Sequence, residues 1–337
     1  MPDKLKQVFF DNCMYDFCNF SCAYCRGTPK LPNQNFRVPE RERIAQSIAI
    51  VDGFVDFGIL KLSGYGEITL VRGYESLIDL PGKAKQLITN GSLLLEERID
   101  HLARIPDLTI CLSLDGHITR MNHCRTGEDE EKLGRILRTL KYISSKGIPL
   151  EINSVLTIYN SSSFGSFLDY LSSEIENFVC FPFPVREFPT KKNSELKPTP
   201  QDADKFSRAA LSHKYRRYLP GQAYMERLVR FLITRKREWG CYVPHVNIGI
   251  NPHGDLMACS CGPKEILGNI FTDPESAFEH KARMGKDKVW QECENCFTHY
   301  EVLNLFFESS ISLGELVRIP TFKSKEVRDK LSRLKPK

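Results

Sequence analysis

Three closely spaced cysteines are the residues of this sequence best suited to chemistry. Cys18, Cys22 and Cys25 form a C-x3-C-x2-C pattern shortly after a short apolar run. Three such thiolates can hold one face of a 4Fe-4S cluster and leave the fourth iron without a protein ligand, so that this iron can bind a small molecule. Structural zinc is the alternative, but zinc prefers four ligands and no fourth Cys or His follows at short range. We therefore predict a cluster with one open iron.

A second set of cysteines lies nearer the C-terminus. Its four candidate ligands are Cys241, Cys259, Cys293 and Cys296. Four thiolates complete the coordination of a 4Fe-4S cluster, so this second cluster would leave no iron open. Cys261 is a rival ligand, and a zinc site made of a C-x-C and a C-x2-C pair stays open as an alternative.

Other cysteines and the histidines near the second set are expected to be structural or solvated. Cys111 alternates within an apolar strand and reads as a core residue. The cysteines without a partner at ligand spacing are Cys13, Cys124 and Cys180. The histidines that we expect to be solvated are His245, His253 and His299.

The elements that must position these residues alternate between short apolar runs and longer amphipathic stretches up to about residue 181. This alternation is typical of βα units around a parallel sheet. The expected strands are Val8–Phe10, Ile59–Ser63, Gln86–Thr89, Leu108–Leu114, Leu150–Leu156 and Phe178–Phe181. The expected helices are near 40–52, 71–80, 95–104, 129–146 and 161–174. Whether the sheet is a barrel or open, chemistry is expected at the carboxyl ends of its strands.

The chain changes character after the sixth expected strand. Five prolines fall between residues 182 and 200, which indicates a linker or mouth loop. Helices are expected near 201–212 and 221–238, followed by a hairpin that turns at Asn251–Gly254.

Composition and charge narrow the class of protein. The chain has 337 residues, of which 41% are hydrophobic and 26% charged, so it is expected to be globular, with about two domains. It has neither a membrane-spanning apolar run nor a signal-peptide core, so we expect a cytoplasmic protein. Twelve cysteines in a reducing compartment favour metal ligation over disulfides. Basic residues gather at 214–237 and 322–337, either as solvated helix faces or, for 214–237, as a surface for an anionic partner.

The first cysteine set carries a resemblance to the radical S-adenosylmethionine (radical SAM) superfamily, which has the same triplet after its first barrel strand. The resemblance implies that Cys18, Cys22 and Cys25 ligate the cluster. It also implies that SAM chelates the open iron and is cleaved on reduction to a 5′-deoxyadenosyl radical, which abstracts hydrogen from a substrate. Tyr24, at the family's aromatic position, would pack near the adenine.

Further segments agree with the family's partial (β/α)6 barrel. The turn with Gly64, Gly66 and Glu67 is similar to the family's glycine-rich motif that receives the SAM ammonium group. Ser113 and Asp115 are similar to its S-x-D-G segment, and alternation sends both side chains to the same face. Weaker candidates for ribose and carboxylate contacts are Asn153 and Arg125.

The second cysteine set resembles the SPASM/Twitch extension of radical SAM enzymes. A full SPASM domain carries two auxiliary clusters, and the smaller cysteine number here matches the Twitch form with one. Gly268–Ile270 and Trp290 occur at similar places in that extension. The fold expected is thus a partial TIM-type barrel with a Twitch-like α+β extension. Its parts would be a barrel over 1–200, linker helices and cluster domain over 201–310, and a basic tail over 311–337.

The two clusters together suggest an oxidoreductase. The auxiliary cluster could accept an electron from the substrate radical, as in the dehydrogenase route that the resemblance offers, with flavodoxin or ferredoxin as the reductant. The triplet starts at residue 18, which favours a small molecule over a peptide. Arg186 and Glu187, after the sixth strand, are candidates for holding or deprotonating the substrate. A peptide- or RNA-modifying radical SAM enzyme and a zinc-stabilised binding protein are the alternatives.

Overall fold

The computed structural model describes residues 4–25, 39–64, 66–187, 193–260, 265–284 and 296–334. Its centre is one nine-stranded sheet, with the order β6-β5-β4-β3-β2-β1-β7-β8-β9. The strands are β1 (Leu5–Asn12), β2 (Val55–Leu62), β3 (Ala84–Thr89), β4 (Leu108–Ser113), β5 (Leu150–Leu156), β6 (Phe178–Pro184), β7 (Asn247–Ile250), β8 (Asp255–Met257) and β9 (Ile266–Asn269). Strands β1 to β6 pair in parallel and form the curved wall of a partial barrel.

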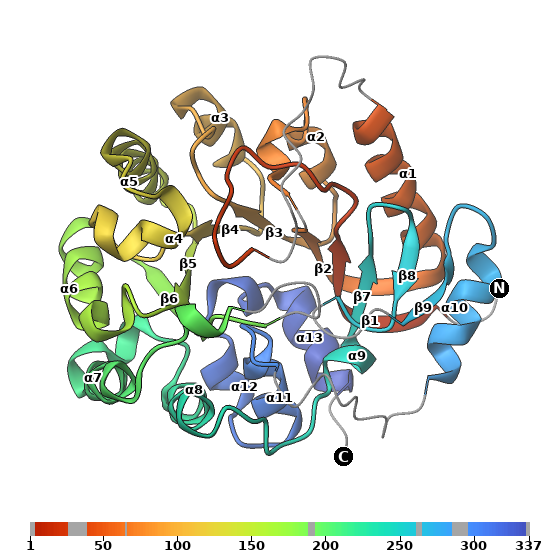
Figure 1. The fold of residues 1–337 in the computed structure, drawn as a ribbon. Coiled ribbons are helices and arrows are strands. Elements are labelled where there is room, and N and C mark those ends of the chain that lie inside the picture. The colour runs from red at the N-terminus through yellow and green to blue at the C-terminus, as the bar shows by residue number, and fades with distance from the viewer. Residues whose placement is uncertain are drawn as a thin grey trace.

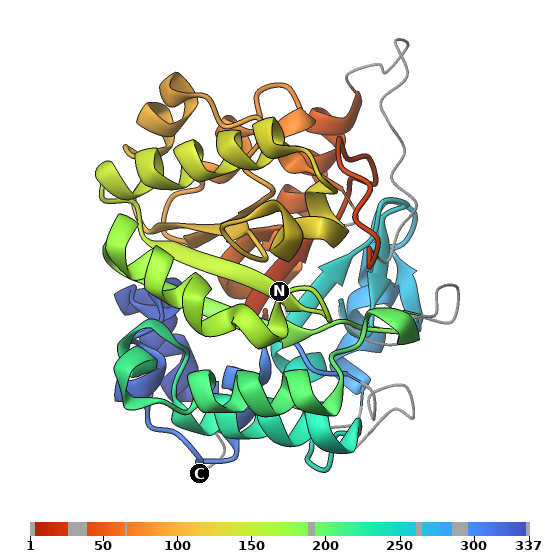
Figure 2. The ribbon, with the colours of Figure 1, turned by 60° about the vertical axis from the view of Figure 1, so that its left-hand side comes forward.

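Helices between the strands cover the outside of this wall (Figure 1). They are α1 (Pro39–Phe54), α2 (Glu75–Ile78), α3 (Glu96–Leu102), α4 (His123–Thr126), α5 (Glu130–Ser145) and α6 (Phe164–Glu174). Figure 2 shows α6, α7 (Pro200–Ala210) and α8 (Gln222–Thr234) layered along one side of the molecule. The strands are almost entirely buried because parallel strands are covered on both faces, although several carry buried polar residues such as Lys61, Gln86 and Glu151.

A long amphipathic helix illustrates how the sequence specifies this outer layer. Asp129 caps α5 by accepting a hydrogen bond from the backbone N–H of Lys132. The buried face of α5 consists of Leu133, Ile136, Thr139, Leu140 and Ile143. These residues recur every three or four positions, so one stripe of the helix faces the sheet.

The C-terminal part of the chain fills the side of the barrel that β1 to β6 leave open. Its helices are α9 (Val243–Val246), α10 (Pro274–Arg283), α11 (Glu301–Phe307), α12 (Leu313–Leu316) and α13 (Lys325–Leu334). In Figure 1, α11, α12 and α13 lie between β6 and β1. The ring of Phe9 in β1 contacts Tyr300 and Phe322 edge to face, with centroids 5.0 and 5.9 Å away. The inner face of β1 therefore packs against residues that follow it by about 300 positions.

The C-terminal hairpin extends the barrel sheet. β7 pairs in parallel with β1, and the antiparallel strands β8 and β9 complete the edge. The hairpin turns at Gly254, whose φ of +87° suits glycine. The predicted partial barrel with an α+β extension is confirmed.

The sequence-based elements agree with the structure for the barrel strands but differ in several helices: α4 and α9 to α12 were not expected, and the helix expected over 221–238 ends at Thr234. All six predicted barrel strands and the hairpin are present. The helix expected over 71–80 is reduced to α2, which follows a single 3-10 turn at Ile68–Leu70. Gly73, with a φ of +72°, interrupts the helix that the apolar spacing indicated. Within the described residues, no helix has the length and apolar character that a membrane span requires.

Candidate active site

The loop after β1 carries the first cysteine set and is anchored to the barrel from two sides. The backbone N–H of Ala23 donates to the carbonyl of Cys124 at 2.7 Å, and Phe17 accepts a hydrogen bond from the backbone N–H of Glu67, also at 2.7 Å. The sulfur of Cys18 accepts from the backbone N–H of Phe20 at 3.3 Å. The loop is thus held beside the carboxyl ends of the strands, where chemistry was expected.

The three thiols of this loop influence one another electrostatically. Burial raises the pKa of Cys18 to about 11 and that of Cys22 to about 12, and Cys25 adds to both shifts. The cation of Arg125 opposes the shift at Cys22. Within the described residues, no three His, Cys, Asp or Glu side chains are grouped closely enough to hold a metal ion. The donors present are three thiols on one loop, partly exposed, and this soft donor set fits an iron–sulfur cluster with three protein ligands.

The glycine-rich turn after β2 packs directly against the cysteine loop. A Cβ on Gly66 would lie 2.1 Å from the carbonyl oxygen of Phe17, and one on Gly64 would lie 3.1 Å from the Cα of Cys13. Only glycine at position 66 allows this approach, because real Cβ atoms essentially never come within 3.0 Å of another heavy atom. The sequence predicted that these glycines leave room for a ligand. The structure adds that Gly66 leaves room for the backbone of the cysteine loop. Tyr65 lies outside the described residues.

Glu67 is buried, and its carboxylate joins two strand ends. One oxygen accepts from the backbone and hydroxyl of Thr69, at 3.2 and 2.7 Å, and from the hydroxyl of Thr89 at 2.7 Å. The other oxygen accepts from the backbone N–H of Asn90 at 2.7 Å. Burial raises the pKa of Glu67, and these four hydrogen bonds oppose the shift. Among the described residues, the second oxygen has this one hydrogen-bond donor, and a contact to an ammonium group stays a prediction.

Asp115 is buried just after the end of β4, and its carboxylate contacts residues of three segments. It pairs with Arg125 at 3.2 Å, accepts from the backbone N–H of Val155 at 2.9 Å and accepts a hydrogen bond from the hydroxyl of Tyr24. Burial lowers the pKa of Arg125, but the carboxylate of Asp115 outweighs it, so that the net shift is upward. Asp115 therefore ties the end of the cysteine loop to β5, and the structure brings together three predicted site residues in one cluster.

Ser113 and Asn153 occupy neighbouring positions on β4 and β5. They are paired in register, and the backbone carbonyl of Asn153 accepts from Leu114 at 3.0 Å. The two residues thus lie at the same level of the barrel, at the carboxyl end of β4 and in the middle of β5. Ribose contact remains a prediction for each.

The loop after β6 carries Arg186 and Glu187. Glu187 forms an ion pair with Lys197 at 2.9 Å. The charge of Arg186 makes a small contribution to the lowered pKa of His299. Glu187 is thus engaged in an ion pair at the surface, and a role in holding or deprotonating the substrate stays a prediction for both residues.

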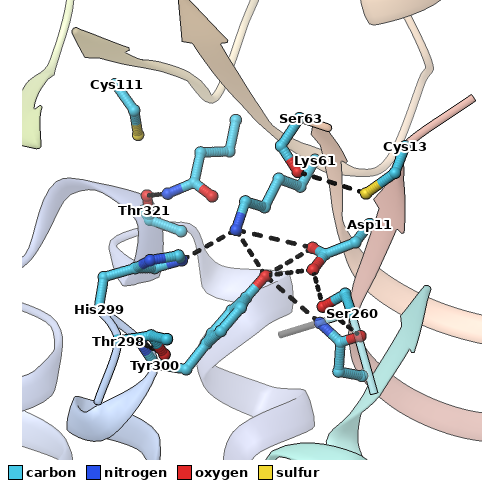
Figure 3. Close-up of polar contacts among 12 residues, drawn as sticks. Asp11, Cys13, Lys61, Ser63, Cys111, Ser260, Thr298, His299, Tyr300 and Thr321 are labelled. Atoms are coloured by element: carbon cyan, nitrogen blue, oxygen red, sulfur yellow. Dashed lines mark hydrogen bonds and ion pairs between the residues drawn. The ribbon is translucent and has the colours of Figure 1, made fainter. Parts of the chain in front are cut away.

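A polar cluster at the carboxyl end of β1 and β2 was missed by the sequence analysis. Figure 3 shows Lys61 at its centre, donating to the imidazole Nε2 of His299 at 2.8 Å and to the hydroxyl of Tyr300 at 2.6 Å. Tyr300 donates in turn to the carboxylate of Asp11, with O···O distances of 2.5 and 2.7 Å. We call Asp11, Lys61, His299 and Tyr300 the Lys61 cluster. A charged residue near the end of each of two apolar strands was the only signal in the sequence.

His299 in this cluster corrects one prediction. It was expected to be a solvated surface residue, but it is partly buried and bonded to Lys61. Burial lowers its pKa well below the usual value, and the cations of Lys61 and Arg186 add to the shift. The imidazole is therefore neutral at neutral pH.

The described cysteines of the second set lie on three segments held together by two buried cations. Arg237 donates to the carbonyls of Cys296 at 3.0 Å and Gly240 at 3.1 Å, next to Cys241. Lys281 donates to the carbonyls of Pro244 and Ala258, next to Cys259, at 2.6 and 3.0 Å. Cys261, Trp290 and Cys293 lie outside the described residues. Auxiliary ligation therefore remains a prediction.

Comparisons of sequence give no relative for this chain. No family model matches it, and no curated protein matches it.

Comparisons of structure give several matches. The protein anSMEcpe with bound S-adenosylmethionine matches over 97% of this chain and 98% of its own, with 17% identity and a TM-score of 0.61. The same protein with S-adenosylmethionine and the Cp18Cys peptide matches over 98% of both chains, with 16% identity and a TM-score of 0.59. SuiB of Streptococcus suis, bound to S-adenosylmethionine, matches over 76% of this chain with 16% identity and a TM-score of 0.57.

The chain spans 60% of the length of SuiB and nearly all of anSMEcpe. At these identities the comparisons establish the fold. The cysteine loop and the glycine-rich turn lie at the strand ends where the sequence resemblance placed them. The protein therefore has the fold of the radical SAM enzymes, a partial barrel extended by a C-terminal auxiliary domain.

Proposed function

We propose that this protein is a radical SAM enzyme. The observation that carries the proposal is the packing of the C-x3-C-x2-C loop against the glycine-rich turn at the carboxyl edge of a partial barrel. Cys18, Cys22 and Cys25 would ligate a 4Fe-4S cluster. Gly64 and Glu67, with Ser113 and Asn153, would receive SAM on the neighbouring strand ends.

The chain's own residues would hold the reactants in place and keep water away. When bound, the cluster and SAM would supply a 5′-deoxyadenosyl radical that abstracts hydrogen from the substrate. Asp115 would fix the cysteine loop through Tyr24 and keep Arg125 beside Cys22. Glu67, with its second oxygen, would orient an ammonium group.

The test is anaerobic purification and reconstitution, followed by iron, sulfide and zinc analysis. About eight iron atoms per chain would support two 4Fe-4S clusters, and about four would support one. Cys22→Ala should abolish the formation of 5′-deoxyadenosine under strong reductant. Cys180→Ala, a buried cysteine in the core, is the matched control and should retain it. Stoichiometric zinc without iron, or 5′-deoxyadenosine from Cys22→Ala, would refute the proposal.

We further propose that Cys241, Cys259, Cys293 and Cys296 hold an auxiliary 4Fe-4S cluster that accepts an electron from the substrate radical. The overall reaction would be an oxidation, in the cytoplasm, with flavodoxin or ferredoxin as the reductant. Cys296→Ala should remove about half of the iron and leave reductive SAM cleavage intact. Unchanged iron would refute the ligand role.

A small molecule is the first candidate substrate, and a peptide is the second. A specific observation favours the peptide: anSMEcpe, which this chain spans almost end to end, has been solved with bound peptides. A protein of this fold can therefore bind a peptide without an additional domain. Deuterated candidate substrates of both classes would decide, because only the true substrate transfers label to 5′-deoxyadenosine.

RNA is supported less by the structure. The basic stretch 214–237 includes two arginines that pair internally with Glu301: Arg227 at 2.7 Å and Arg237 at 3.0 Å. The charges of these two arginines are therefore neutralised by Glu301 within the fold and contribute little to binding RNA. RNA binding with a steep salt dependence would restore this alternative.

A further inference from the structure

A buried lysine without a counterion lies beside the second cysteine set. Lys281 is 4% exposed, and its ammonium group donates to the carbonyls of Pro244 at 2.6 Å and Ala258 at 3.0 Å. Within the part of the chain that the structure describes, these two carbonyls are its only polar partners, and no carboxylate pairs with it. Burying an ammonium group is costly unless an opposite charge compensates it. The structure around Lys281 thus lacks a negative charge.

Lys281 occupies a position of α10 that the packing of this helix makes suitable for an apolar residue. The buried face of α10 consists of Ala277, Phe278 and Lys281. The ring of Phe278 stacks on Phe54 of α1, with centroids 4.9 Å apart, so this face belongs to the core. An apolar side chain at position 281 would be buried there without the cost of a charge. A lysine at such a position is a departure from the apolar pattern of the kind found at functional sites.

Two other buried cations of the chain show the contrast. Arg237, the second cation that holds the cysteine segments together, pairs with Glu301 at 3.0 Å. Lys330 of α13 pairs with Asp56 of β2. Both charges are therefore neutralised by a carboxylate of the protein, whereas the charge of Lys281 is left for an anion that the described side chains do not supply.

The contacts of Lys281 place its charge among the predicted ligands. The carbonyl that accepts at 3.0 Å belongs to the peptide group that joins Ala258 to Cys259. The other carbonyl, of Pro244, belongs to the segment that follows Cys241. Burial lowers the pKa of Lys281 to about 8, and the charge of Cys259 opposes this shift. The ammonium group therefore lies where the segments of two predicted ligands meet.

The chemistry of this set fits an anionic iron–sulfur cluster. A 4Fe-4S cluster with thiolate ligands is negatively charged and gains one further negative charge on reduction. Its reduction potential depends on nearby charge and on hydrogen bonds to the sulfurs. The side-chain amide of Asn304 donates to the sulfur of Cys241 at 3.9 Å. A hydrogen-bond donor and a buried cation are thus both placed beside the predicted ligands.

We propose that Lys281 is the counterion of the auxiliary cluster and raises its reduction potential, so that one electron passes more readily from the substrate radical to the cluster. The inference rests on the proposed auxiliary cluster and assigns it a residue that favours the oxidative outcome. Lys281 does not ligate iron. Its charge stabilises the reduced form, which is the more negative of the two, by electrostatic attraction.

The test measures the reduction potential of the auxiliary cluster by itself. A full-length background that carries Cys18→Ala, Cys22→Ala and Cys25→Ala would keep only this cluster after reconstitution. The potential is followed by electron paramagnetic resonance during titration with dithionite. In this background, Lys281→Met should shift the equilibrium about tenfold toward the oxidised cluster, which lowers the potential by about 59 mV for one electron.

Matched variants separate the charge of Lys281 from its packing and its hydrogen bonds. Lys281→Arg keeps the charge and should retain most of the potential. Lys281→Gln keeps a donor without the charge and should behave like Lys281→Met. Lys330→Met is the control, because Lys330 is also a buried lysine but is paired with Asp56 at the amino end of β2. It should change the equilibrium by less than about twofold.

The potentials and the iron content together decide the inference. An unchanged potential in Lys281→Met, or a wild-type potential in Lys281→Gln, would overturn it. Loss of iron from both neutral variants with retention in Lys281→Arg would support it, because only the charge distinguishes the two groups. Loss of iron from all three would show that Lys281 only joins the two segments, and would overturn it as well. Circular dichroism confirms that each variant is folded.

Failure of this inference is distinguishable from failure of the proposed function. The protein with its first cysteine set intact is assayed for 5′-deoxyadenosine in parallel. If it cleaves SAM but the background without that set binds no iron, the auxiliary cluster and the role of Lys281 are refuted and SAM cleavage stands. If Lys281→Met shifts the potential but the intact protein never cleaves SAM, only the radical SAM proposal is refuted.

Discussion

At the scale of single residues, buried charges do most to shape the site. Asp115 and Arg125 are both nearly inaccessible, and each would be costly to bury without the other. Their partners, Tyr24 and the backbone of Val155, belong to the cysteine loop and to β5. Because the two charges neutralise each other, the Asp115–Arg125 pair can stay buried and hold the cysteine loop at a fixed distance from the barrel.

Removing the charge of Asp115 should destabilise the fold. Asp115→Asn keeps an oxygen for Val155 but leaves Arg125 buried without a counterion, which costs about 3 to 5 kcal/mol. The measurement is urea unfolding of the full-length protein. Asp129→Asn is the control, since it changes an exposed N-cap of α5 for which asparagine is equally suited. Similar unfolding midpoints for the two variants would show that the Asp115 pair is not structural.

His299 should make the stability depend on pH. Its pKa is lowered from the ordinary value of 6.5 in the folded state, so below about pH 6.5 the unfolded chain binds a proton that the folded chain does not. Stability should therefore fall as the pH drops from about 7.5 to about 5.5, by roughly 1 kcal/mol from this residue. His299→Gln should lose that much of the dependence in urea unfolding at the two pH values. Identical slopes for both proteins would contradict a buried neutral imidazole.

At the scale of elements, the close fit between the cysteine loop and the glycine-rich turn matters most. Among the described residues, neither segment forms a helix or a strand at these contacts, and each segment directly follows a strand. Their positions follow from the register of β1 and β2, in which Asn12 is paired with Leu62. A substitution in one segment should consequently shift the position of the other segment.

Gly66→Ala tests this coupling. The new methyl group would overlap with the backbone of Phe17, so the cysteine loop must shift and the reconstituted protein should lose most of the iron bound by this loop. Gly53→Ala is the matched control, because nothing lies within 4 Å of its Cβ position in α1, and alanine there should stabilise the helix by up to about 1 kcal/mol. Iron content and 5′-deoxyadenosine yield are measured for both. Full iron in Gly66→Ala would show that the loop tolerates the shift.

The sequence predicted the strands well and the Lys61 cluster not at all, for a physical reason. β6, with the sequence FVCFPFP, is a continuous apolar run, and local composition is enough to identify such a strand. Asp11 and Tyr300 are 289 residues apart and meet only because the C-terminal segment enters the barrel. No periodicity encodes such a contact. The same holds for Arg227, whose acidic partner Glu301 is 74 positions away.

At the scale of the whole molecule, the two ends of the chain meet on the barrel. The basic C-terminal segment forms α13, which buries Val327 and Leu331 against β1 and β2. Lys330 of α13 forms an ion pair with Asp56 of β2. The last helix is thus part of the core and not only a solvated surface.

Val327→Asp should therefore destabilise the entire protein. The change places an unpaired carboxylate at a fully buried position, and we expect a loss of about 3 kcal/mol or more in urea unfolding. Arg328→Asp is the control, since it lies on the exposed face of the same helix and changes the charge by more. Equal stability of the two variants would show that α13 is dispensable for the barrel.

The pairing of β1 with both β2 and β7 has a consequence for biosynthesis. One edge of β1 finds its partner after about 50 residues, but the other must wait until β7 has left the ribosome, some 240 residues later. At about 5 to 20 residues per second, a nascent chain spends on the order of ten seconds or more with that edge uncovered. Exposed strand edges invite pairing between chains, so co-translational protection by a chaperone should raise the soluble yield of this protein.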